Sequence, residues 1–188
     1  MGIEAIINAF DIEDDVQCIK KLRKGLINST YLISNKNQKY ILQKINSSVF
    51  KNVNTIMQNI EKINAHLKER NYNYESLTLI KTRDKENLVI DNNTDSWRCF
   101  AFIEHQDYDS TNLNKKIMEE FGEAIGHFHT CLTDFDTKEI KNTIDNFHDT
   151  LVYLNTFKQA IKQSNKKRRN EVNEFFYFIQ NIRNKFLS

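Results

Sequence analysis

Proline is absent from the sequence, and glycine occurs only four times in 188 residues. Proline- or glycine-rich linkers and low-complexity segments are therefore missing, and we find no internal repeat. No apolar run approaches the roughly 18 residues that a membrane-spanning helix needs. The N-terminal segment MGIEAIINAF also lacks the basic start and the small-residue cleavage site of a secretory signal peptide. These absences predict a cytoplasmic protein that has no membrane partner.

Neither sign of charge dominates, because 27 Lys and Arg residues stand against 25 Asp and Glu, for a formal net charge of +2 at pH 7. Such a balance gives no reason to expect a nucleic-acid partner. The cysteines Cys18, Cys99 and Cys131 stand singly within apolar stretches. We expect them to be small buried residues in a reducing compartment, and we predict neither a disulfide nor a metal site from them.

The first half of the chain has the pattern of an antiparallel sheet, with short β-prone runs separated by turns. The expected strands lie at 16–22, 30–33, 40–42, 77–80, 88–90 and 97–103. Between residues 53 and 67 the apolar positions recur every three or four residues. This spacing predicts one long helix with an apolar stripe against the sheet.

After Glu104 the apolar period becomes helical for the rest of the chain. The expected helices lie at 117–132, 147–161 and 172–186. Gly122 and Gly126 lower the helix propensity of the first of them, which suggests that another backbone packs close by. Strands followed by helices predict an α+β fold with two lobes, residues 1–104 and residues 105–188.

The turn at the start of the segment GLINSTYLI, residues 25–33, offers chemistry. A glycine turn between two strands, with small polar side chains beside it, can cover nucleotide phosphates with backbone N–H groups. The candidates are Gly25, Asn28, Ser29 and Thr30. With one glycine, the segment fits an ordinary hairpin equally well.

Five segments together resemble the aminoglycoside phosphotransferase and choline kinase-like superfamily. They are GLINSTYLI, YILQKINSSVFKNV, WRCFAFIE, EFGEAIGHFHTCL and NFHDT. Within the superfamily they look most like the N-acetylhexosamine 1-kinase branch of sugar kinases. The resemblance implies a protein-kinase-like N-lobe, with an antiparallel sheet and one helix, followed by the first helices of an incomplete C-lobe. It also implies transfer of the γ-phosphoryl group of ATP to a sugar or amino-sugar hydroxyl, assisted by Mg²⁺.

The resemblance assigns a role to the strand around residue 43. Kinases keep a lysine there that contacts the α- and β-phosphates. This sequence has Gln43 at the inward position, and Lys44 should point to the opposite face because strand neighbours alternate. Two alternatives stay open: a bulge turns Lys44 inward, or Gln43 acts as a neutral donor. Glu61, central in the long helix, fits the partner of that lysine poorly and suits a solvent-facing residue better.

The resemblance also implies a hinge between the lobes at Phe102, Ile103 and Glu104, where backbone groups would read the adenine edge. His148 and Asp149 would lie near the acceptor cleft, although an Asp before a helical stripe is also typical of a helix cap.

No catalytic residue and no metal ligand is predicted within these 188 residues. The spacing of His105, Asp107 and Asn112, with Asp134 and Asp136 downstream, formally matches a kinase catalytic loop. We interpret this match as accidental, because a helical stripe follows it where the family has two strands. The catalytic loop is expected beyond residue 188, so that this chain would be the inactive front half of a kinase.

Two further hypotheses are compatible with the sequence. The chain could be a non-catalytic binding or regulatory module built on a degenerate kinase lobe, or a kinase for choline, homoserine or an aminoglycoside. The predicted helices also carry more aromatic residues than they can bury against a small lobe, which predicts a homodimer through the C-terminal helices. These residues are Phe121, Phe128, Phe147, Phe157, Phe175, Phe176 and Phe186.

Overall fold

The computed structural model describes residues 1–13, 15–23, 25–107, 111 and 113–186. The chain forms two compact units, Met1–Ile144 and Asp145–Ser188. The first unit holds a six-stranded sheet, and the second holds only helices. The predicted α+β class, with an antiparallel sheet followed by helices, is confirmed.

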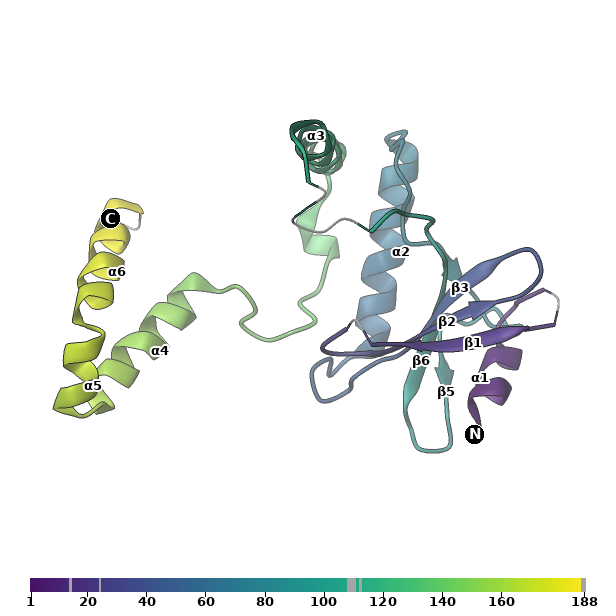
Figure 1. Cartoon of the computed structure of the whole chain (residues 1–188), viewed down its shortest axis with the longest axis horizontal. Coiled ribbons are helices and arrows are strands. Elements are labelled where there is room, and N and C mark those ends of the chain that lie inside the picture. Colours follow the sequence, from purple (N-terminus) through teal and green to yellow (C-terminus); the bar gives the residue numbers. More distant parts are fainter. Residues whose placement is uncertain (14, 24, 108–110, 112, 187–188) are drawn as a thin grey trace. The chain divides into compact units, whose positions relative to one another are not determined.

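All strand pairs of the sheet are antiparallel, in the order β1-β2-β3-β6-β4, with β5 also paired to β6 (Figure 1). The strands are β1 (Cys18–Leu22), β2 (Ser29–Ser34), β3 (Lys39–Lys44), β4 (Leu79–Ile80), β5 (Val89–Ile90) and β6 (Ser96–Ala101). Hairpin turns join the first three strands. In the second turn, Asn35 Oδ1 accepts hydrogen bonds from the backbone N–H groups of Asn37 and Gln38, at 2.9 and 2.7 Å. This local Asx geometry sets the register of β2 against β3.

One face of the sheet is the core of the first unit. Ile33, Tyr40, Leu42, Trp97 and Cys99 alternate with residues of the other face and are all buried. The short helix α1 (Ile3–Ala9) covers this face with its own buried residues, Ile6 and Ile7, and with the adjoining Phe10. Burying one such large side chain contributes about 1.5–3 kcal/mol. The sequence analysis did not predict this helix.

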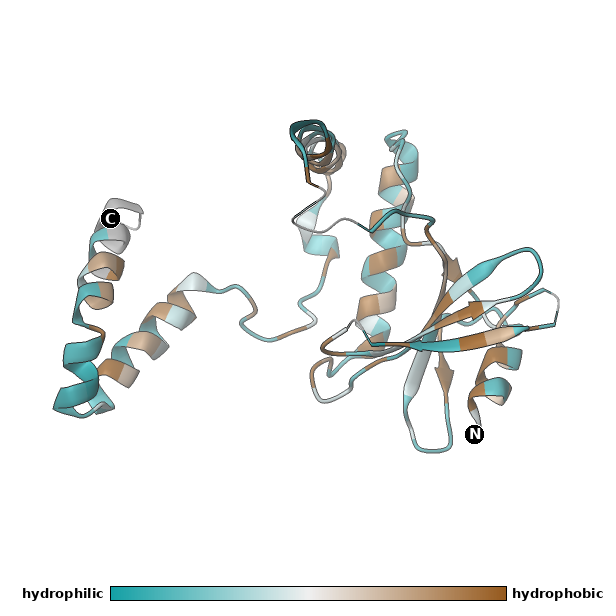
Figure 2. Ribbon diagram, viewed as in Figure 1, coloured by the Kyte–Doolittle hydropathy of each residue, from teal (hydrophilic) through white to brown (hydrophobic). Residues whose placement is uncertain are grey.

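Two longer helices complete the first unit, α2 (Val53–Glu69) and α3 (Lys115–Cys131), and both begin at a capping asparagine. Figure 1 shows α1 and α2 flanking the sheet from different sides, and in Figure 2 apolar bands recur along α2. His66 near the end of α2 contacts the Cys131 carbonyl at 3.0 Å. Tyr72 stacks on His127 of α3, with ring centroids 5.4 Å apart. A short 3-10 helix, η1 (Thr137–Glu139), follows.

The second unit contains α4 (Thr150–Gln163), α5 (Lys166–Glu171) and α6 (Asn173–Phe186). The helix predicted at 172–186 is therefore preceded by a separate short helix. Phe157 of α4 and Phe176 of α6 are neighbours, with ring centroids 6.2 Å apart. Among its residues with a described side chain, none is buried. The unit therefore has little apolar core of its own.

The structure differs from the sequence-based expectations for Cys18, for the two helix glycines and for the unit boundary. Cys18 is exposed rather than buried, because it begins the edge strand β1, whereas Cys99 and Cys131 are buried as expected. Among the described residues, no other backbone packs against Gly122 or Gly126, because the space that a Cβ would occupy at either is open for 4 Å around. The lobe boundary predicted at 104/105 differs from the boundary between the compact units at 144/145, and it stays a prediction about kinase lobes.

In the part of the chain that the structure describes, no helix has the length and apolar character to cross a membrane.

The cysteines give a test of the fold. Burial raises the pKa of the Cys99 thiol to about 12, so that Cys99 carries almost no reactive thiolate near neutral pH. We expect a disulfide-exchange reagent at pH 8 to label Cys18 rapidly in the native protein, and Cys99 and Cys131 only after denaturation. Mass spectrometry of the labelled peptides measures this. Equally fast labelling of Cys99 and Cys18 would contradict the buried position of β6.

Candidate functional site

The face of the sheet opposite the core carries two rows of side chains across β2, β3 and β6. Strand register places Thr30, Gln43 and Arg98 in one row. A second row, one pleat further along, contains Leu32, Ile41 and Phe100. Except for Phe100, these residues are only half-buried. The face therefore offers a polar end and an apolar end on one pleated surface.

Gln43 is the centre of the polar row. Its Nε2 donates to Thr30 Oγ1 at 3.2 Å, and its Oε1 accepts from Arg98 Nε and Nη2 at 3.1 and 3.0 Å. A guanidinium has only donors, so the atom of Gln43 that faces it must be the oxygen. The contact therefore fixes the orientation of the amide, with its NH₂ group toward Thr30.

Lys44 lies on the opposite face and contacts none of these residues. Its Nζ forms an ion pair with Asp95, and that hydrogen bond raises the pKa of the lysine. β3 pairs residue by residue with both neighbours, so no bulge turns Lys44 inward. Of the two alternatives left open by the sequence, the geometry favours Gln43.

The turn between β5 and β6 places Asp95 beside Lys44. Asp91 is buried, and its Oδ1 accepts from the backbone N–H groups of Asn93 and Asp95, at 2.8 and 3.1 Å. Its Oδ2 accepts from Trp97 Nε1 at 3.0 Å. The Trp97 hydrogen bond, which outweighs the opposing effect of burial, lowers the pKa of the Asp91 carboxyl.

The predicted phosphate turn lies between β1 and β2. Gly25 has φ of 153°, which L-residues rarely adopt, and Leu26 beside it is fully exposed. Asn28 Oδ1 accepts from the backbone N–H of Asn46 at 3.0 Å, which ties the turn to the end of β3. A cavity of about 200 Å³ lies there, lined by Ile27, Ser29, Lys44, Ile45, Asn46, Ser47 and Asp95. Gly25, Asn28, Ser29 and Thr30 thus gather at the same end of β3 as Gln43.

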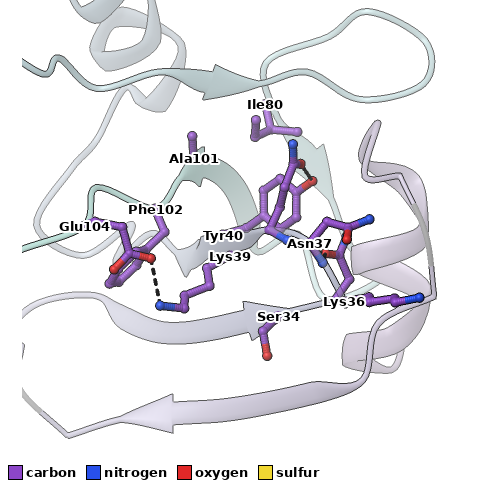
Figure 3. A pocket seen from close by; sticks show the side chains of 11 residues that line it. Ser34, Lys36, Asn37, Lys39, Tyr40, Ile80, Ala101, Phe102 and Glu104 are labelled. Carbon is purple, nitrogen blue, oxygen red and sulfur yellow. Dashed lines mark hydrogen bonds and ion pairs between the residues drawn. The ribbon is translucent and has the colours of Figure 1, made fainter.

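The predicted hinge lies at the other end of β3, beside a cleft of about 650 Å³ (Figure 3). Phe102 and Glu104 line the cleft together with the β2–β3 turn. Lys39 Nζ forms an ion pair with Glu104 at 2.7 Å and lies 5.2 Å from the centre of the Phe102 ring. Figure 3 shows the Lys39 ammonium and the Glu104 carboxylate facing each other beside Phe102. Their charges are therefore matched within the protein.

Some backbone N–H and C=O groups at the hinge already have hydrogen-bond partners within the protein, and others do not. The Phe102 N–H donates to the Lys39 carbonyl at 3.0 Å, and the Ile103 carbonyl is 2.7 Å from His105 Nδ1. Within the described residues, the N–H groups of Ile103 and Glu104 have no hydrogen-bond partner. Of these two residues, Glu104 lines the cleft and Ile103 precedes it in the chain.

The other predicted site residues have structural contacts. Glu61 forms an ion pair with Lys81 at 3.5 Å and contacts neither Gln43 nor Lys44. Asp149 caps α4, because its Oδ1 accepts from the N–H groups of Leu151 and Val152, at 3.0 and 3.1 Å. His148 is exposed and lies edge-on to Phe147. A substrate role for His148 and Asp149 stays a prediction.

The formal catalytic-loop match is followed by α3, as its rejection assumed. His105 Nε2 and Asp107 Oδ1 are 3.9 Å apart, and Asn112 lies outside the described residues. Asp134 forms an ion pair with Arg70, and Asp136 caps η1. The downstream aspartates therefore have structural roles.

Arg98 is the residue that sequence reasoning missed. It follows Trp97 in a strand that was expected to be apolar, and it shares the face of Gln43. Its side chain also lies over the Phe100 ring, 4.9 Å from the centroid. A lone arginine inside an apolar strand pattern was the available signal, because such strands rarely contain a charge without a partner.

Comparison with known proteins relates this arrangement to two enzymes of known structure. No protein-family model matches the sequence. The spectinomycin phosphotransferase APH(9)-Ia, solved in complex with ADP and spectinomycin, superposes with a TM-score of 0.57 at 12% identity. The superposition covers 91% of this chain and 53% of that protein. The fold is kinase-like.

A microcompartment-associated aminopropanol kinase superposes with a TM-score of 0.52 at 16% identity, over 68% of this chain and 39% of that protein. The chain thus spans about half the length of the first of these phosphotransferases, and less of the second. At these identities the comparisons establish the fold, and the sugar-kinase branch suggested by the sequence has no counterpart among them.

The Asp91 contacts predict how stability depends on pH. The folded-state pKa is depressed, so the stabilisation is complete above the ordinary value of 3.8 and is lost as pH falls through the lower folded value. We expect Asp91→Asn to lower the unfolding free energy at pH 7 and to make its decline below pH 4 shallower. Urea titrations followed by fluorescence of Trp97, the single tryptophan, measure both. Parallel pH profiles for the two proteins would contradict this role.

Proposed function

We propose that this chain is the nucleotide-binding part of an ATP-dependent phosphotransferase of the aminoglycoside phosphotransferase and choline kinase-like superfamily. The observation that carries the proposal is the arrangement along β3. The Gly25 turn and the Thr30–Gln43–Arg98 row lie at one end, and the cleft beside Phe102, Ile103 and Glu104 lies at the other. An apolar row between them suits the flat face of a base. The kinase-like fold and the ADP bound by APH(9)-Ia support this interpretation.

In the proposed complex the adenine lies at the hinge, where the N–H groups of Ile103 and Glu104 have no partner among the described residues. The phosphates extend toward Gly25, Asn28, Ser29 and Thr30. Residues 1–104 are the nucleotide-binding lobe in this proposal, and residues 105–188 begin the helical lobe. Mg²⁺ would be held largely by residues of the family's catalytic loop, which has no counterpart that we accept in these 188 residues.

The acceptor in the proposed reaction is a hydroxyl of a sugar or amino sugar. This choice rests on the sequence resemblance of YILQKIN and the segments that follow it. The names of the two similar structures indicate different acceptors, spectinomycin and aminopropanol. The cytoplasmic location expected from the sequence stays a prediction.

A non-catalytic binding module is the second candidate. Gln43 favours it, because a neutral amide stands where kinases keep a lysine. The two functions differ in what the complete reading frame encodes after residue 188. A loop with an Asp and an Asn, followed by a metal-binding Asp, supports the kinase, and its absence from the gene supports the module.

The first functional test is ligand binding by the 188-residue chain. We expect calorimetry to detect ADP and adenosine binding, and we expect Ile41→Glu to weaken both by at least about tenfold, because a carboxylate would be desolvated against the base. Lys85→Gln is the control, since Lys85 is exposed and pairs with Asp11, and it should change affinity less than about twofold. Equal affinities for wild type and Ile41→Glu would contradict this site.

The same chain should transfer no phosphoryl group to sugars, because the groups that position the acceptor and the metal are not provided by the residues we assign. A coupled assay for ADP release with a panel of sugars and amino sugars tests this. If transfer is detected and Asp107→Ala abolishes it, the rejected catalytic-loop match is the true one.

We propose self-association through the helices as well. Phe147, Leu151, Phe175 and Phe178 are each about 60% exposed or more. Phe121 on α3 is also exposed, Phe128, Phe157 and Phe176 are half-buried, and Phe186 is outside the described side chains. The partner in this proposal is a second copy, whose equivalent helices would cover the exposed rings.

Light scattering over a dilution series tests the association. We expect a mass twice that of the 22.3-kDa chain at tens of micromolar, and Phe175→Glu should shift it toward the monomer. A monomer at that concentration, with no binding of a dye that reports apolar surface, would contradict the dimer.

A further inference from the structure

Arg98 carries a charge that nothing in the described structure neutralises. Its Nη1 is buried and has no hydrogen-bond partner. The other contacts of the guanidinium are the neutral Gln43 amide and the face of the Phe100 ring. Among the described residues no carboxylate forms an ion pair with it. A largely buried cation without an anion is costly, so its position calls for a ligand of negative charge.

The carboxylates of the β5–β6 turn, and Glu61 of α2, have other partners. Asp91 accepts hydrogen bonds from Trp97 and two backbone groups, and Asp95 pairs with Lys44 on the opposite face. Glu61 of α2 pairs with Lys81. Burial lowers the pKa of Arg98 to about 10, and the group stays charged at neutral pH. The positive charge is therefore permanent under physiological conditions.

Gln43 connects this charge to the phosphate turn. Two N–H groups of Arg98 hold its oxygen, and its NH₂ group, which has two hydrogens, uses one on Thr30 Oγ1. The second hydrogen is available on the same half-buried face. Charge-assisted hydrogen bonds polarise the amide and make its NH₂ group a better donor.

We propose that Arg98 and Gln43 act together as the polyphosphate-binding unit of the site, Gln43 as the contacting donor and Arg98 as the source of charge that orients it. The ligand class is the di- or triphosphate of a nucleotide, so the inference rests on the proposed function. No lysine is needed in this arrangement, which explains why Lys44 can be committed to Asp95 on the other face.

Comparing ADP with adenosine isolates the phosphate contribution. In the full 188-residue chain, Arg98→Met should weaken ADP binding by about 10- to 100-fold, the range for a lost hydrogen bond to a charged group, and change adenosine binding less than about twofold. Arg70→Met is the matched control, because it removes an exposed guanidinium at the end of α2. It should leave both affinities unchanged.

The variant Gln43→Glu tests the loss of the Arg98 charge without a loss of stability. The new carboxylate would pair with Arg98 and neutralise it, so this variant should unfold at the same temperature as wild type or higher and still bind ADP about 10-fold more weakly or worse. Its adenosine affinity should be unchanged. This variant keeps the inference testable if Arg98→Met does not fold.

The outcomes are distinct. Wild-type ADP affinity in both variants overturns the role of Arg98 and Gln43 and leaves the nucleotide site standing. Parallel losses for ADP and adenosine also overturn it, because they indicate a general distortion. If wild type binds no ADP, the proposed nucleotide-binding function fails. Binding of inorganic tripolyphosphate then tests the role of Arg98 and Gln43 separately. Binding that Arg98→Met weakens supports an anion site at these residues, and no binding overturns that site as well.

Discussion

The position of β3 between β2 and β6 is the constraint on which the rest of the first unit depends. Antiparallel pairing on both edges leaves no freedom of register, so each side chain of β3 is assigned to a face. Tyr40 and Leu42 enter the core with α1, and Ile41 and Gln43 lie on the opposite face of the sheet. A slip of one residue would exchange the two sets and bury Gln43 in the core. The buried residues that stabilise the sheet therefore also position the candidate site.

Element types were largely predictable, because the periods of strands and helices are local properties of the sequence. The antiparallel sheet and the helices α2, α3 and α4 follow from spacing alone. The helix α1 was missed, since seven residues give too few turns for a clear period and its stability comes from Phe10 and its neighbours in the core. The exposure of Cys18 was missed for a similar reason, because only the strand order makes β1 an edge.

The candidate site was predicted in part. Strand alternation correctly separated Gln43 from Lys44, and the resemblance directed attention to the Gly25 turn and the hinge. Arg98 could not be assigned a partner from the sequence, because it meets Gln43 across 55 residues of chain, through the register of β6 on β3. Such contacts depend on long-range pairing, which no local pattern records. The bond between Asp91 and Trp97 is local, but it requires a specific turn between β5 and β6.

The Arg98 guanidinium, which forms no ion pair with a carboxylate among the described residues, has a further consequence for stability. A charge held away from water without a counter-ion lowers the free energy of unfolding, and any anion that binds there returns some of that stability by mass action. The Arg98 side chain thus lowers the stability of the fold and raises its affinity for an anion. Selection for thermal stability alone would favour a neutral or acid-paired residue at this point of the sheet. In the proposed complex, the phosphates of the nucleotide would therefore stabilise the fold as well as occupy the site.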